Sequence, residues 1–145
     1  MKSFNFWQKW LFVTSIIMLV FGVALALANG SPLFGWLMGG INAAFWTDAA
    51  PTPVMLAYQL WVVGLLGTVM ACWGLTVAFI AWYPFRRLER WSWTCLAAGV
   101  GLWFVLDESL SLFYRVYFNA IFNLGFLVML VLPLIFTMSA FRKNS

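Results

Sequence analysis

Histidine is absent from this 145-residue chain, and charged residues make up only 8% of it. Without histidine, the chain lacks the common ligand of haem iron and zinc and the most frequent acid–base catalyst. We therefore expect no haem and no histidine-ligated metal, and the sequence indicates no other cofactor. The two cysteines, Cys72 and Cys95, lie in apolar segments and form no C-x-x-C motif. This pattern favours two buried free thiols over a disulfide exchanger.

The scarcity of charge also decides the class of protein. Soluble domains carry about 25% charged residues, whereas 65% of this chain is apolar. So much apolar surface cannot be hidden inside a domain of this size, so membrane lipid must be its solvent. One domain, residues 1–145, is the natural interpretation. The net charge of +4 implies no nucleic-acid partner, because the cations flank apolar segments as topology signals do.

Four apolar runs predict an all-α membrane protein, a four-transmembrane-helix bundle. The predicted spans are residues 11–28, 56–82, 91–112 and 117–140. Pro133 lies in the fourth run, where a neighbouring group can take up the carbonyl that a proline frees. Small residues four apart, such as Gly22 with Ala26 and Gly67 with Ala71, predict close packing of helices within the chain, with homo-oligomer contacts as the alternative.

The cations predict how the spans are oriented. Under a four-span arrangement seven Lys and Arg residues fall on one side and Arg115 falls on the other. Cytoplasmic loops are enriched in these residues, so we expect a bacterial inner-membrane protein with both termini in the cytoplasm. The seven are Lys2, Lys9, Arg86, Arg87, Arg90, Arg142 and Lys143.

The loop between the first two spans is too long for a simple connection. Ser31 can cap a helix that Pro32 starts, and apolar residues then recur every four residues. This predicts a short helix over residues 32–46, followed by an irregular connector over 47–53. The helix is too short to span, so it either lies at the outer interface or forms a lid over an outward-facing pocket.

Asp107 and Glu108 are adjacent carboxylates in a chain with only four acidic residues. Acids at membrane depth usually have a partner or a function. Asp107 lies 17 residues after Arg90, or about 25 Å along a helix, which places it a little below the outer boundary. Glu108 shares a helix face with Gly101, so we expect Glu108 to face the bundle and Asp107 to face either the edge of the polar group or Arg115.

Polar residues of three spans are expected at this same level. They have two interpretations. In the first, Arg115 neutralises one acid and the asparagines link helices. In the second, the group is the polar end of a ligand-binding pocket that is entered from the outer side, and an unpaired acid there carries a proton. The residues are Tyr58, Gln59, Asp107, Glu108, Ser111, Arg115, Asn119 and Asn123.

The stretch W-F-V-L-D-E-S-L-S-L-F-Y-R-V-Y-F-N, residues 103–119, resembles the third-to-fourth helix hairpin of small four-helix DoxX-like bacterial membrane proteins. Some DoxX proteins are similar to quinol-oxidoreductase subunits, so the resemblance implies an accessory or anchor role in a membrane complex. It assigns no role to any residue.

Taken from the residues, the favoured function is binding of an apolar or amphipathic small molecule or partner in an outward-facing site between the second, third and fourth spans. One alternative is an accessory or anchor subunit of a membrane oxidoreductase complex. Another is a membrane enzyme that acts on a lipid-like substrate, with Asp107 and Glu108 as its acid–base pair. No motif names a reaction, so a binding role is favoured over catalysis.

Overall fold

The computed structural model describes residues 2–46 and 50–143. Over these residues the chain is all-α, with five α-helices and one short 3₁₀ helix. Four of the helices in this part of the chain are long and apolar enough to cross a membrane. The predicted four-span architecture is therefore confirmed. The elements are α1 (Lys2–Ala28), η1 (Pro32–Phe34), α2 (Gly35–Phe45), α3 (Pro53–Trp82), α4 (Arg90–Phe113) and α5 (Tyr117–Lys143).

Two helices begin before the apolar runs that predicted them. α1 begins at Lys2 instead of residue 11. α3 begins at Pro53 instead of residue 56, because Thr52 caps it and its hydroxyl accepts a hydrogen bond from the amide of Met55 at 3.3 Å. The short helix between the first two spans is also confirmed, as η1 followed by α2. Residues 47–49 of the predicted connector lie outside the described part of the chain.

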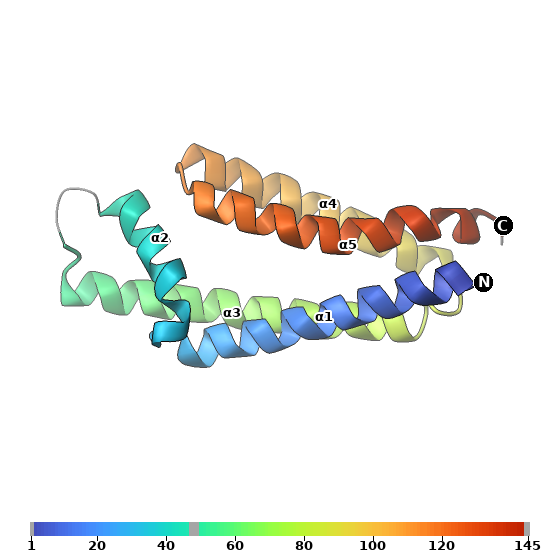
Figure 1. The fold of residues 1–145 in the computed structure, drawn as a ribbon, viewed down its shortest axis with the longest axis horizontal. Helices are drawn as coiled ribbons and strands as arrows, with labels where there is room; N and C mark the ends of the chain where they lie inside the picture. The colour runs from blue at the N-terminus through green and yellow to red at the C-terminus, as the bar shows by residue number, and fades with distance from the viewer. Residues whose placement is uncertain (1, 47–49, 144–145) are drawn as a thin grey trace.

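The four spans form two antiparallel pairs, α1 with α3 and α4 with α5 (Figure 1). The pairs converge at the end of the molecule where both termini lie, here called the terminal end. They diverge toward the opposite end, the α2 end, where α2 runs from one pair toward the other (Figure 1). The two pairs thus enclose a wedge that is narrow at the terminal end and covered by α2 at the wide end.

Glycines bring α1 and α3 into backbone contact. A Cβ atom added at Gly67 would lie 2.5 Å from the amide nitrogen of Ala26, and one at Gly74 would lie 2.5 Å from that of Leu19. A Cβ at Gly22 would likewise meet the backbone of Ala71. Small residues allow this approach, and close packing holds helices together where lipid provides no hydrophobic drive. The predicted packing within the chain is confirmed for these residues.

The two pairs meet in an apolar core at the terminal end. Phe85, in the turn between α3 and α4, has no exposed surface, and its ring lies 4.8 Å from that of Phe141, centroid to centroid. Leu88 in the same turn adopts φ 59°, in the left-handed region, as the chain reverses into α4. The buried members of this core are Leu11, Met18, Val77, Ala81, Phe85, Leu96, Val100, Leu130, Leu134 and Phe141.

Pro133 lies inside α5 and has no amide hydrogen for the carbonyl of Met129 four residues earlier. Trp10 of α1 takes up this carbonyl, since its indole Nε1 donates to Met129 O at 3.0 Å. A second indole, from Trp93 of α4, donates to Leu134 O at 2.9 Å. The expectation that a neighbouring group satisfies the freed carbonyl is therefore confirmed, and α1 is tied to α5 as a result.

We expect Gly67→Ala to destabilise the protein by about 1–3 kcal/mol, because its methyl group would force the backbones of α1 and α3 apart. Gly101→Ala is the matched control, since a Cβ there would have no atom within 4 Å. Apparent melting temperatures in a mild detergent measure both effects. Equal melting temperatures for the two variants would contradict the proposed role of Gly67.

We expect Trp10→Phe to destabilise the protein by about 0.5–1.5 kcal/mol, because it leaves the Met129 carbonyl without a donor. In a Pro133→Ala background the new amide can bond that carbonyl, so the cost of Trp10→Phe should fall. A double-mutant cycle by reversible denaturation measures this coupling. Trp93→Phe is the control, because its acceptor is a different carbonyl and its cost should be the same in both backgrounds.

Candidate functional site

A three-residue turn, 114–116, folds α5 back along α4. Arg115 adopts φ 59° in this turn, and the amide of Val116 donates to the carbonyl of Ser111 at 2.7 Å. Because the turn is so short, residues close to it on one helix face residues close to it on the other. Asp107 and Ser111 are one helical turn apart on α4, as are Asn119 and Asn123 on α5, so the four side chains can meet.

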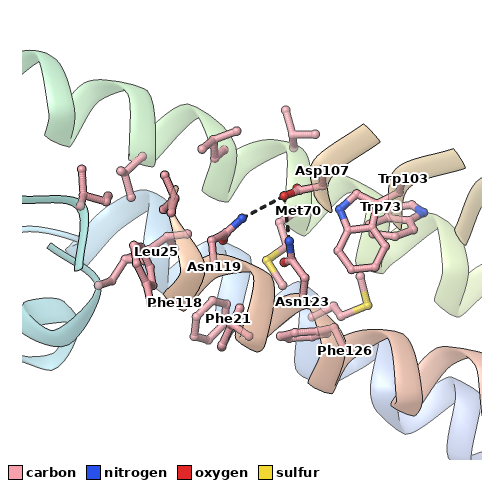
Figure 2. A pocket seen from close by; sticks show the side chains of 18 of the residues that line it. Phe21, Leu25, Met70, Trp73, Trp103, Asp107, Phe118, Asn119, Asn123 and Phe126 are labelled. Atoms are coloured by element: carbon pink, nitrogen blue, oxygen red, sulfur yellow. Dashed lines mark hydrogen bonds between the residues drawn. The ribbon is translucent and has the colours of Figure 1, made fainter. Parts of the chain in front are cut away.

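Three donors converge on one oxygen of Asp107. Its Oδ1 accepts hydrogen bonds from Asn123 Nδ2 at 2.7 Å, from Asn119 Nδ2 at 2.9 Å and from Ser111 Oγ at 3.2 Å. Asn119 Nδ2 also donates to Ser111 Oγ at 2.8 Å. Figure 2 shows the asparagines of α5 pointing at Asp107 across the interface. The network fixes the Asp107 side chain and joins α4 to α5 near the α2 end.

Gln59 and Tyr58 of α3 are not part of the hydrogen-bond network around Asp107. Gln59 is buried and accepts a hydrogen bond from the indole of Trp46 at 3.3 Å, while its Nε2 donates to the sulfur of Met38 at 3.3 Å. It therefore fastens the segment around α2 to α3. The side chain of Tyr58 is exposed on the surface of α3. The polar residues predicted at one depth are thus divided between the Asp107 network of α4 and α5 and the separate contacts of Gln59 on α3.

Glu108 and Arg115 lie outside the Asp107 network, and here the structure differs from the expectation. The hydrogen bonds from Asn119 and Asn123 show that Asp107 faces α5. A Cβ at Gly101 would meet nothing within 4 Å, so that glycine marks no packed face. Glu108 Oε1 is buried and has no hydrogen-bond partner among the described residues. Arg115 is exposed, and within residues 2–46 and 50–143 it forms no ion pair with either acid.

A cavity of about 400 Å³ lies in the wedge between the two helix pairs. All four spans and α2 contribute residues to its lining, whereas the predicted site lay between the second, third and fourth spans only. Its polar lining consists of Asp107, Asn119 and Asn123, and the rest is apolar or aromatic (Figure 2). The apolar lining is Met18, Phe21, Leu25, Trp36, Leu37, Ile41, Val63, Leu66, Val69, Met70, Trp73, Trp103, Val116, Phe118, Phe122 and Phe126.

Aromatic rings form much of this lining. The rings of Trp73 and Trp103 lie 5.3 Å apart, centroid to centroid, on facing helices α3 and α4. On the α5 side, the ring of Phe122 lies 5.1 Å from that of Phe126 and 5.7 Å from that of Phe21. Sequence reasoning missed these residues, because an apolar side chain on a span gives the same signal whether it faces lipid, a neighbouring helix or a cavity.

α2 covers the wide end of the cavity. Trp36, Leu37 and Ile41 of α2 line it, and Phe34 just before α2 is buried. A Cβ atom added at Gly40 would lie 2.7 Å from the ring of Phe118 on α5, so the glycine permits close contact between the two helices. Of the two predicted positions for this helix, the contacts match a lid more closely than a helix lying free at an interface.

The cysteines and acids offer no evident metal site. Cys72 and Cys95 are free, as expected, but they are exposed on the outer faces of α3 and α4 and not buried. Each lies on a side of its helix that no other helix covers, and such a side faces the lipid in a membrane. In the part of the chain that the structure describes, no group of three or more Cys, Asp or Glu residues is placed to hold a metal ion.

Comparison with protein-family models, with curated proteins and with solved structures found no match for this chain.

We expect the Asp107 network to stabilise the α4–α5 pair by an interaction that a double-mutant cycle can detect. Asn123→Leu and Asp107→Leu should each destabilise the protein, and their coupling energy should be about 0.6–1.7 kcal/mol. Reversible unfolding in mixed micelles measures the four corners of the cycle. A second cycle that pairs Asp107→Leu with Gln59→Leu is the control. It should be additive, because Gln59 and Asp107 share no partner.

Proposed function

We propose that this four-span membrane protein binds an apolar or amphipathic small molecule in the cavity between its two helix pairs. The observation that supports this is the cavity itself, about 400 Å³ in volume and lined by apolar and aromatic side chains with three polar ones on one wall. Small-molecule sites typically enclose about 300–1,000 Å³ and combine an apolar lining with a few placed polar groups.

We also propose that the α2 end, and with it the wide end of the cavity, lies on the outer side of a bacterial inner membrane. In the structure, Lys9, Arg86, Arg90 and Arg142 belong to segments at the terminal end, whereas Arg115 lies at the α2 end. A positive-inside arrangement then places both termini in the cytoplasm and α2 outside. A ligand would reach the cavity from the outer leaflet or from the space beyond it.

The geometry supports binding better than acid–base catalysis. A catalytic pair must reach the same reacting atoms of one substrate. Asp107 lines the cavity and Glu108 does not, so the two acids are not placed to act together. The proposal is carried by the cavity and not by the DoxX-like resemblance of the last hairpin.

We expect Leu66→Trp to weaken binding of a neutral amphiphile by about tenfold or more, because the larger side chain would occupy the cavity that Leu66 lines. Leu66 is exposed as well as lining the cavity, so the helix can accept the substitution. Leu65→Trp is the matched control, since the neighbouring Leu65 is exposed and does not line the cavity.

The measurement is saturable binding of radiolabelled 1-dodecanol to the full-length protein in phosphatidylcholine nanodiscs, with empty nanodiscs as the background. Binding that saturates in the wild type and in Leu65→Trp but is weakened in Leu66→Trp supports the proposal. If the wild type shows no saturable binding, or the two variants behave alike, the cavity is not a ligand site.

A further inference from the structure

We propose that the cavity selects an amphipathic amine, a molecule whose ammonium head binds Asp107 and whose apolar body lies among the aromatic side chains. This inference rests on the proposed binding function and adds the chemical class of the ligand. It is carried by the free side of the Asp107 carboxylate, by the placement of cations in the chain and by the rings near the acid.

Hydrogen bonds hold the Asp107 carboxylate through one of its oxygens and leave the other oxygen available to a ligand. All three hydrogen bonds from Ser111, Asn119 and Asn123 reach Oδ1. From the residues that the structure describes, Oδ2 receives no hydrogen bond. A carboxylate oxygen only accepts hydrogen bonds, so its natural partner in the cavity is a ligand that donates one. An ammonium group does this and supplies the opposite charge.

Among the side chains that the structure describes, no cation is placed to take that position. Within residues 2–46 and 50–143, the cavity lining includes neither lysine nor arginine. Arg115 is nearest along the chain, yet it is exposed in the turn beyond the network and forms no ion pair with Asp107. The other described cations lie on segments at the terminal end. A negative charge in an apolar wall with no internal counter-ion favours a positive ligand.

The aromatic lining suits the same ligand. Asp107 and Trp103 lie on the same face of α4, one helical turn apart, and Trp73 faces Trp103 from α3 (Figure 2). The faces of indole rings attract cations, most strongly where water is excluded. The remaining lining, including Phe21, Phe122 and Phe126, accommodates an alkyl or aromatic body. A neutral lipid-like molecule would use this apolar part of the cavity but not the carboxylate.

The nanodisc assay described above tests this with matched ligands. Dodecylamine is charged near neutral pH, whereas 1-dodecanol and N-dodecylacetamide have the same chain and no charge. We expect the wild type to bind dodecylamine about tenfold or more tightly than either neutral compound, the size of effect that a close charge pair in a desolvated site produces. Equal affinities for the three compounds would overturn the inference.

Two variants locate the preference. Asp107→Asn should lower dodecylamine affinity by about tenfold while changing 1-dodecanol affinity little. Glu108→Gln, which replaces the neighbouring carboxyl group outside the cavity lining, should leave both affinities nearly unchanged. Retained 1-dodecanol binding shows that the Asp107 variant is folded. If that variant loses both ligands, the comparison of charged and neutral ligands in the wild type still decides the question.

Three further outcomes identify the source of the ammonium group and distinguish failure of this inference from failure of the proposed function. An ammonium group also occurs in the headgroup of phosphatidylethanolamine, next to a phosphate for which the cavity wall offers no cation. We therefore expect the corresponding single-chain lysolipid to compete poorly with dodecylamine, and equal competition would overturn the choice of a free amine. If none of the ligands binds saturably, the proposed function itself fails. If all bind equally and Asp107→Asn changes nothing, the cavity remains a binding site and only its charge selectivity is rejected.

Discussion

The backbone contact between α1 and α3 is the constraint on which the rest of the arrangement depends. Helices in lipid gain little from burying apolar side chains against each other, so they associate through close packing and polar contacts. Gly22, Gly67 and Gly74 provide the packing for this pair. The α4–α5 pair has no equivalent, since a Cβ at Gly99, Gly101 or Gly125 would meet nothing within 4 Å. Polar contacts must therefore hold the second pair, and the Asp107 network is placed where they are needed.

The cavity follows from this difference. At the terminal end, the large apolar core joins the two pairs, and Trp10 of α1 also crosses between them by bonding the Met129 carbonyl of α5. Trp93 of α4 bonds the Leu134 carbonyl of α5, within the second pair. At the α2 end, each pair is held together internally, by glycines in one and by the Asp107 network in the other. Neither set of contacts crosses from pair to pair there. The space between them is closed by α2, which lies across the opening and contacts α5 through Gly40 and Phe118.

Hydropathy and helix capping were sufficient to predict the spans and the short helix between the first two. They could not predict which spans pair, because apolar residues surround all four helices. The sequence placed Asn119 and Asn123 at the level of Asp107, and they do bond it, because the short turn between α4 and α5 makes residues near it on the two helices face each other. Gln59 was predicted at the same level but bonds Trp46 and Met38 instead. Equal depth in a membrane does not show which helices lie side by side. Glu108 was expected to face the bundle because it shares a helix face with Gly101, but a Cβ at Gly101 would meet nothing within 4 Å, so that face is not packed there.

The identity of residue 107 bears on why the network exists. If it served only to join α4 to α5, an amide at this position would accept hydrogen bonds from Asn119 and Asn123 without placing a charge in a span, where charge is costly. The residue is instead an acid, about 9 Å along the helix from the end of α4. The three donors reach one oxygen of a residue that lines an apolar cavity, and the second oxygen receives no hydrogen bond from the described residues. Fastening two helices explains the amides, the serine and an acceptor at residue 107. The proposed cationic ligand adds a reason for the second oxygen of that acceptor, which the network does not use.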